Sequence, residues 1–351
     1  MSLIDVIFVE SLAVALVAVL GWGVKTLPAE RWQMIAAVPL TKNANGEWQG
    51  LNLTYYGFFS ATASVFGAAM MLVLMTSVGT PLMVVAGLIA TLMAICLPAS
   101  KLVARVVEGK RHTFTVAGAA FLGALIIPPG LWLAQRVLAE RFETRIYVIP
   151  VMASIAIAYA LSEAIGRMAC LSFGCCYGKP LRDASPTLAR MFERFPLVFH
   201  GSTKKAAYAS GLGDEPLIPV QTITAVVFTA SGLVGLGLFL AGRSRLAGLI
   251  PALATWSWRA ASESLRADYR GDQKISAYQI MALIAMVYST AAFTILPENG
   301  PVPDLMAGLT QISSAGVIVI LQLTWLGLFL FYGRSRVTGS VVSFHVVSER
   351  V

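Results

Sequence analysis

The sequence predicts an all-α protein that forms a polytopic bundle of eight or nine transmembrane helices. Two observations carry this prediction. Of the 351 residues, 57% are hydrophobic and 13% are charged, whereas about a quarter of the residues of a soluble domain are charged. Nine continuous apolar runs also follow one another along the chain, and a helix of about 20 apolar residues crosses the hydrocarbon core of a bilayer.

The apolar runs are interpreted one by one as spanning helices. The first is interpreted as a retained helix and not a signal peptide, because it lacks a positive start, contains Glu10 and ends without a small-residue cleavage site. The seventh is the weakest prediction because it carries charges. The predicted spans are Leu3–Val24, Tyr55–Val78, Pro81–Ala99, Phe114–Leu138, Ile146–Leu171, Pro219–Ala241, Leu246–Leu265, Ile275–Leu296 and Leu309–Tyr332.

The connections between the runs divide the chain into three parts. Residues 1–50 hold the first helix and a polar connector, residues 51–296 hold a membrane core, and residues 297–351 hold the last helix and a tail. The core contains the longest extramembrane stretch, residues 173–218. Within it, Thr187–Phe195 fits either a short amphipathic helix lying on the membrane or a solvated loop.

Composition narrows the classes of partner and cofactor. The net charge of +8 fits contact with anionic lipid headgroups. The sequence has no basic stripe with interleaved aromatic residues, so we do not expect binding to nucleic acid. The four cysteines give no disulfide framework, since Cys175 and Cys176 are adjacent. The metal-binding spacing C-x-x-C is absent. We therefore expect no metal site.

Ionisable side chains at membrane depth are costly, so they are functional candidates. In the fifth run, Glu163 and Arg167 are four residues apart and can pair on one helix face, which Cys170 and Gly174 continue. The glycines at 174 and 178 are expected to end the helix and to let the backbone approach a ligand. The alternative is that Glu163 and Arg167 form a structural pair that locks helix packing.

The seventh run carries a second charged stripe. Arg259, Glu263 and Arg266 follow at helical spacing, so Glu263 is expected to hold both arginines. Arg167 and Arg259 would then clamp one phosphodiester from two helices and stabilise charge on a departing phosphate. The alternative is a helix end at the membrane interface with snorkelling arginines. A transporter or flippase of anionic lipid would use the same residues.

Four segments of the chain form one pattern: Tyr55–Phe58, Gly166–Gly178, Pro219–Gln221 and Arg259–Arg266. Together they resemble the prolipoprotein diacylglyceryl transferase family. Gly166–Gly178 resembles the end of the family's arginine-bearing helix, and Tyr55–Phe58 resembles the Trp-Tyr-Gly-Leu that opens its first core helix. Pro219-Val220-Gln221 resembles its His-Pro-Ser-Gln, and Arg259-x-x-x-Glu263-x-x-Arg266 resembles its late arginine helix. The resemblance covers roughly residues 50 to 296, and the first and last helices would be additions to a seven-helix core.

The resemblance implies a reaction and a site. The family transfers the diacylglyceryl group of phosphatidylglycerol to the thiol of a lipoprotein cysteine and releases glycerol phosphate, in the bacterial inner membrane and without a cofactor. Catalytic roles are expected for Arg167, Arg259, Glu163 and Glu263. Substrate contacts are expected at Tyr56, Cys170, Gly174, Cys175, Gly178, Gln221 and Arg266.

The departures from the family concern the handling of the proton. The family's essential histidine has no counterpart in Val116–Phe121, and its asparagine, glutamate and tyrosine correspond to Cys170, Cys175 and Thr255. Glu163 or Glu263 is the expected replacement base, with His112 as an alternative. Cys175 is an alternative covalent carrier of the glyceryl group, and a redox role for Cys175–Cys176 lacks the usual C-x-x-C spacing.

Two questions stay open at this point. The basic residues predict that the side holding the loops after the first, third, fifth and seventh helices is cytoplasmic, whereas the resemblance implies that it is external. The acceptor could also be a sugar, an alcohol or another lipid. The leading hypothesis is a lipid transferase, and the runner-up is a non-enzymatic protein that binds or moves anionic lipid.

Overall fold

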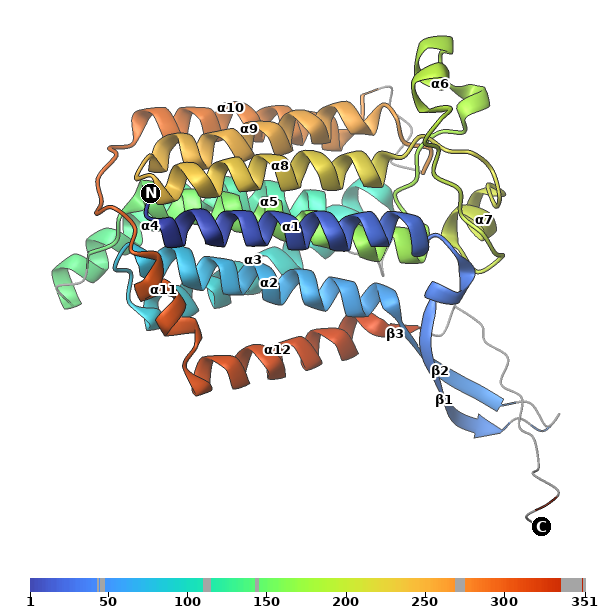
Figure 1. Ribbon diagram of the computed structural model, residues 1–351, viewed down its shortest axis with the longest axis horizontal. Coiled ribbons are helices and arrows are strands. Elements are labelled where there is room, and N and C mark those ends of the chain that lie inside the picture. The colour runs from blue at the N-terminus through green and yellow to red at the C-terminus, as the bar shows by residue number, and fades with distance from the viewer. Residues whose placement is uncertain are drawn as a thin grey trace.

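The structure is a computed structural model that describes residues 1–42, 44, 48–109, 115–142, 145–268, 275–335 and 349. Long helices lie side by side along one axis (Figure 1). They are α1 (Leu3–Thr26), α2 (Tyr55–Ser77), α3 (Leu82–Glu108), α4 (Val116–Phe142), α5 (Val148–Phe173), α8 (Val220–Leu240), α9 (Ser244–Glu263), α10 (Ala277–Ile295) and α12 (Ala315–Gly333).

Among the described residues, eight of these helices are long and apolar enough to cross a membrane, and α9 is the exception. Its 20 residues include Arg245, Arg259 and Glu263, and it packs between α5, α8 and α10. The predicted all-α polytopic bundle is confirmed, and the chain is a multi-pass membrane protein.

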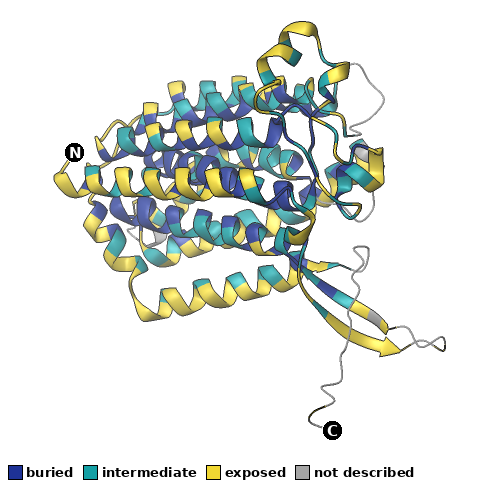
Figure 2. Ribbon diagram, turned by 45° about the vertical axis from the view of Figure 1, so that its right-hand side comes forward, coloured by how far each residue is buried: buried dark blue, intermediate teal, exposed yellow. Residues whose placement is uncertain are grey.

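Helix α5 lies at the centre of the bundle, in contact with α2, α8 and α9. Of its most apolar 18-residue stretch, 72% is buried (Figure 2). Small residues make this possible, because they let helix backbones approach closely. Ala153, Ala158 and Ala160 of α5 are at most 1% exposed. In α8, a Cβ on Gly232 would lie 2.6 Å from the Leu161 side chain.

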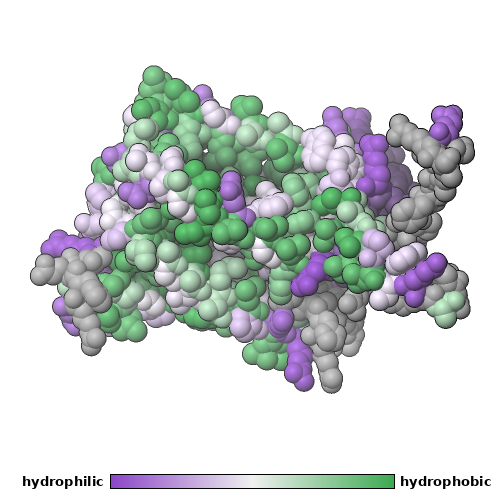
Figure 3. Space-filling view, turned by 90° about the horizontal axis from the view of Figure 1, so that it is seen from below, coloured by the Kyte–Doolittle hydropathy of each residue, from purple (hydrophilic) through white to green (hydrophobic). Residues whose placement is uncertain are grey.

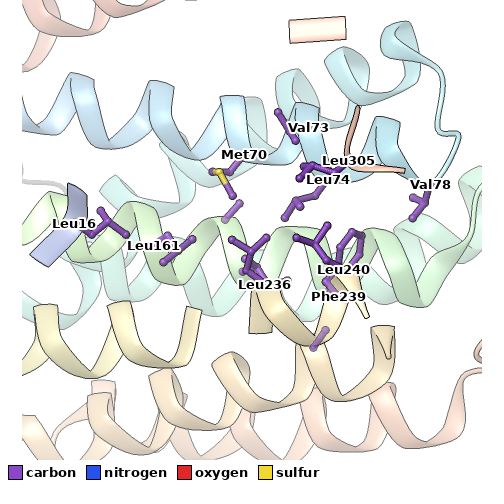
Figure 4. Packing of buried hydrophobic residues seen from close by; sticks show 14 of the residues in the cluster. Leu16, Met70, Val73, Leu74, Val78, Leu161, Leu236, Phe239, Leu240 and Leu305 are labelled. Atoms are coloured by element: carbon purple, nitrogen blue, oxygen red, sulfur yellow. The ribbon is translucent and has the colours of Figure 1, made fainter. Parts of the chain in front are cut away.

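A hydrophobic core fills the space between α2, α5 and α8 (Figure 4). The cluster includes Met70, Val73 and Leu74 of α2, Leu161 of α5 and Leu236 of α8. The outer surface of the bundle is also apolar. Seen from below, green side chains cover most of the bundle and hydrophilic ones gather toward its two ends (Figure 3), as expected for a surface in contact with lipid.

One end of the bundle carries most of the extramembrane structure (Figure 1). The connector after α1, predicted only as a polar segment, contains the 3₁₀ turn Glu30–Trp32 and then an antiparallel hairpin. Its strands β1 (Met34–Lys42) and β2 (Trp48–Thr54) pair Val38 with Leu51, and the two-residue strand β3 (Arg334–Ser335) pairs with β2. Most of β1 is exposed, so its sequence lacks the alternation of apolar and polar residues that indicates a half-buried strand.

The long loop contains the short helices α6 (Pro186–Phe192) and α7 (Lys205–Ser210) and a 3₁₀ turn at Leu181–Asp183. Helix formation within Thr187–Phe195 is therefore confirmed, although α6 ends at Phe192; its position on the membrane surface stays a prediction. At the opposite end of the bundle, α11 (Leu305–Ile312) precedes α12.

Lys204 ties this loop to two helix ends. Its ammonium group donates to the carbonyl of Ser172, at 2.5 Å, and to that of Leu27, at 2.9 Å. These carbonyls belong to the C-terminal ends of α5 and α1, where a cation is favoured by the helix dipole. The side chain is fully buried, and burial lowers the pKa of Lys204 to about 7 against a smaller opposing effect of Glu30.

Candidate functional site

The guanidinium groups of Arg167 and Arg259 meet at one carboxylate. Arg167 forms an ion pair with Glu163 Oε1 along α5, and Arg259 of α9 places Nη2 3.4 Å from the same oxygen. The side chains of Glu163, Arg167 and Arg259 are 8%, 12% and 16% exposed. The predicted pairing of Glu163 with Arg167 is confirmed. The approach of two arginines from separate helices is present as well.

Tyr159 is a member of this cluster that the sequence analysis missed. Arg259 donates a hydrogen bond to the phenol oxygen of Tyr159. Tyr159 lies one helical turn before Glu163 in α5. The available signal was the spacing of Tyr159, Glu163 and Arg167, which are successive fourth residues on one helix face. Thr255, which the resemblance would align with the family tyrosine, is buried, and its hydroxyl donates to the Ala252 carbonyl at 3.0 Å.

Arg266 is held differently from the prediction. Helix α9 ends at Glu263, so Arg266 lies beyond the helical stripe that was expected to include it. Its Nη1 is 3.6 Å from Glu263, and its Nε and Nη2 donate to the two oxygens of Asp268 at 2.7 and 2.6 Å. The expectation that Glu263 holds both arginines by ion pairing is therefore corrected: Glu263 pairs with Arg266, and Arg259 pairs with Glu163. Asp268 is a second residue that was missed.

A small cavity of about 30 Å³ opens among these charges. This is room for about two or three water molecules, so a lipid phosphate enters only when side chains move. The wall carries three arginines and two glutamates and comes from α5, α8, α9 and the adjoining loops. It is formed by Glu163, Arg167, Cys176, Val220, Gln221, Thr224, Phe228, Trp258, Arg259, Ser262, Glu263 and Arg266.

Gln221 closes one side of the cavity. It is 1% exposed, and its amide nitrogen donates to the Cys175 carbonyl at 2.8 Å. Its amide oxygen is buried and finds no partner among the residues that the structure describes. The Nε atoms of Arg167 and Arg259 are also buried and have no hydrogen-bond partner among the described residues. Buried polar groups of this kind are usually bonded, so the cavity wall has donors and an acceptor to offer a ligand.

The two glycines predicted to approach a ligand serve chain packing. Gly174 ends α5 with φ +72°, and a Cβ there would lie 3.1 Å from the Cβ of Lys204. A Cβ on Gly178 would lie 2.2 Å from the carbonyl oxygen of Ile218. Protein atoms fill the space that each glycine leaves, and neither glycine is among the described residues that line the cavity.

Three cysteines converge where the chain leaves α5. Cys170 lies in the last turn, Gly174 reverses the chain, and Cys176 adopts φ +58°, which is uncommon for a residue with a side chain. The three sulfur atoms lie within 4.8 Å of one another, with 3.9 Å between Cys170 and Cys176. Hydrogen bonds from the Cys170 and Cys175 thiols hold the pKa of Cys176 well below its usual value, and Arg266 and Arg167 act in the same direction.

Tyr56 borders this cysteine cluster. Its ring packs edge-on against Phe173, with 5.5 Å between the centroids, and its hydroxyl interacts electrostatically with the three cysteines and with Arg167. The predicted contact residues Tyr56, Cys170 and Cys175 thus lie beside the charged cavity, and Gln221 and Arg266 lie in its wall. His112, the alternative base, lies outside the described residues.

Compared with known proteins, the chain matches no family model and no curated sequence. The resemblance to the diacylglyceryl transferases therefore stays a prediction that depends on the four motifs. The chemistry of the site does not depend on this resemblance: Arg167, Arg259 and Arg266 lie together in the cavity wall, and planar guanidinium groups bind phosphate oxygens in pairs.

Proposed function

We propose that this protein is a membrane transferase of the bacterial inner membrane, which moves a diacylglyceryl group from phosphatidylglycerol to an acceptor nucleophile. The observation that carries the proposal is the shared contact of Arg167 and Arg259 with one oxygen of Glu163. Two guanidinium groups from separate helices converge there on a point that a single anion occupies. The four motif resemblances supply the reaction class.

In the proposed step the lipid phosphate displaces Glu163 from the two arginines. An acceptor thiol then attacks the glyceryl carbon that carries the phosphate, so a carbon–sulfur bond forms as the carbon–oxygen bond breaks. The electron pair of the broken bond leaves with glycerol phosphate, whose growing charge Arg167 and Arg259 stabilise. The displaced Glu163 is free of its ion pairs at that moment and takes the proton of the thiol.

The test is release of the headgroup. Purified protein is incubated with phosphatidylglycerol labelled in its headgroup glycerol and with membrane extract as a source of acceptors. We expect glycerol phosphate to appear, and Arg167→Ala to lower its rate by about 10²–10³-fold. Arg182→Ala is the matched control, because Arg182 forms an exposed loop pair with Glu215 at 2.6 Å. Equal rates for wild type and Arg167→Ala would contradict the proposal.

A non-enzymatic lipid-binding protein is the second candidate. It is favoured by one observation: no histidine occurs among the described residues that line the cavity. The same arginines would then bind an anionic headgroup without breaking it. Mass spectrometry of the acceptors separates the two candidates, because only the transferase leaves a molecule that has gained the diacylglyceryl mass.

A further inference from the structure

We propose that Cys170, Cys175 and Cys176 bind one Zn²⁺ ion, with an open coordination position beside the charged cavity. The sequence spacing gave no reason to expect this, because C-x-x-C is absent. The reversal at Gly174 supplies the geometry instead, since it folds Cys175 and Cys176 back onto the last turn of α5.

The sulfur positions fit a thiolate–zinc site. A zinc–sulfur bond of about 2.3 Å places the sulfurs of a three- or four-coordinate site about 3.8–4.0 Å apart. The Cys170 and Cys176 sulfurs are 3.9 Å apart, and the remaining distances are within 4.8 Å. Binding therefore requires shifts of about 1 Å at most, within reach of a side-chain rotation. Soft thiolate ligands select zinc over magnesium or calcium.

The surrounding charges fit the same ion. Three thiolates and Zn²⁺ carry a net charge of −1, and three cations interact with the cysteines: Arg167, Arg266 and Lys205. Without a metal, three thiolates crowded within 4.8 Å would repel one another. With it, the cluster becomes a single anion that the neighbouring cations balance.

The fourth position faces the charged cavity. Of the three cysteines, Cys176 is the one that lines this cavity, and the wall next to it includes Gln221. The amide oxygen of Gln221 is buried without a partner among the described residues, so it is available to accept a hydrogen bond from a ligand of the metal. Three protein ligands with one open position are the arrangement of catalytic zinc, whereas structural sites have four.

An open position gives the zinc a part in the proposed transfer, and this part depends on that proposal. A coordinating thiol is deprotonated, so an acceptor thiol bound there releases its proton to Glu163 or water. Its sulfur then forms the bond to the glyceryl carbon while the bond to the phosphate breaks, and the zinc keeps its oxidation state. This would supply the deprotonation that the family histidine performs.

The experiment measures metal binding directly. The full chain is purified in detergent with a non-thiol reductant, its zinc content is measured, and Co²⁺ is titrated into the metal-free protein. We expect one zinc per chain and a thiolate-to-cobalt charge-transfer band. Affinity should fall at least about tenfold in Cys170→Ser and Cys176→Ser. Cys96→Ser in α3 is the control and should bind as wild type does, since Cys96 is outside the cluster.

A second measurement needs no variant and so avoids folding defects. Zn²⁺ should protect the three cluster cysteines of the wild type from alkylation, read by mass spectrometry, and leave the reaction of Cys96 unchanged. Equal alkylation with and without zinc, or a Cys170–Cys176 disulfide in place of bound metal, would overturn the site. If the protein binds zinc but releases no headgroup, only the proposed transferase reaction is refuted. If headgroup release continues unchanged after zinc is removed, only the role of zinc in that reaction is refuted.

Discussion

Helices α5 and α12 are both apolar enough to cross a membrane, yet they occupy opposite environments. In α5, 72% of the most apolar stretch is buried against protein, and in α12 the share is 6%. Lipid tails are as apolar as leucine, so hydropathy does not decide which helix goes to the centre. What differs is the presence of small and ionisable residues. Alanines and the pair Glu163–Arg167 mark α5, whereas α12 exposes Val319, Leu323 and Phe331.

The largest effect expected from this comparison is that of Glu163→Gln. It removes the carboxylate that Arg167 and Arg259 share, and breaking a buried ion pair costs about 3–5 kcal/mol of the free energy of unfolding. Thermal unfolding in detergent measures it. Phosphatidylglycerol should raise the unfolding temperature of this variant by more than it raises that of the wild type, because in the variant the lipid phosphate no longer competes with the Glu163 carboxylate for the two arginines.

The control for that variant is Glu215→Gln, which removes the partly exposed loop partner of Arg182. We expect a change within about 0.5 kcal/mol, since surface substitutions are usually that mild. If both variants unfold alike and respond alike to lipid, the charged centre of α5 is no more important than a surface pair.

An intermediate effect is expected of Gly235→Ala in α8. A Cβ at this position would lie 2.7 Å from the backbone oxygen of Ala247 in α9, so the helices must separate, and overpacking of this kind costs about 1–3 kcal/mol. Gly327→Ala in α12 meets nothing within 4 Å and should leave the unfolding temperature unchanged or slightly higher. Equal losses in the two variants would mean that α12 is also packed against protein.

The smallest effect is the pH dependence that Lys204 contributes. With a pKa of about 7 in the folded state against 10.5 for the free side chain, the unfolded chain binds more protons between these values. Stability should therefore rise with pH above 7, by at most about 1.4 kcal/mol per pH unit. Lys204→Met should flatten this rise in unfolding temperature, and Lys205→Met should keep it. An unchanged slope in Lys204→Met would assign the dependence to other groups.

The bundle was predictable because a long continuous apolar run crosses a bilayer as a helix, which satisfies all of its backbone hydrogen bonds within the segment. The pairing of Glu163 with Arg167 was predictable for a similar reason, since both residues lie on one helix and their spacing sets their distance. The helical interpretation also placed Arg259 correctly, because α9 continues as far as Glu263.

The remainder of the site depends on where helices end and on contacts between segments distant in sequence. By its spacing, Arg266 was predicted to lie on the same helix face as Glu263. Helix α9 ends at Glu263, however, and Arg266 donates hydrogen bonds to Asp268 instead. The spacing of Tyr159 places it on the helix face of Glu163, but its hydrogen bond with Arg259 joins residues 100 apart in the chain, and spacing along one helix does not predict such a contact. The three cysteines meet only because Gly174 reverses the backbone, and the hairpin of β1 and β2 lacks a buried face to reveal it.

The position of Lys204 has a consequence for biosynthesis. The ribosome completes α1 and α5 before it reaches this residue, so the ends of the two helices are joined only after the loop that follows α5 has emerged and folded back. A nascent chain halted before residue 204 holds both helices without the donor that their last carbonyls share. The two hydrogen bonds that join these helix ends therefore form only after residue 204 has been synthesised.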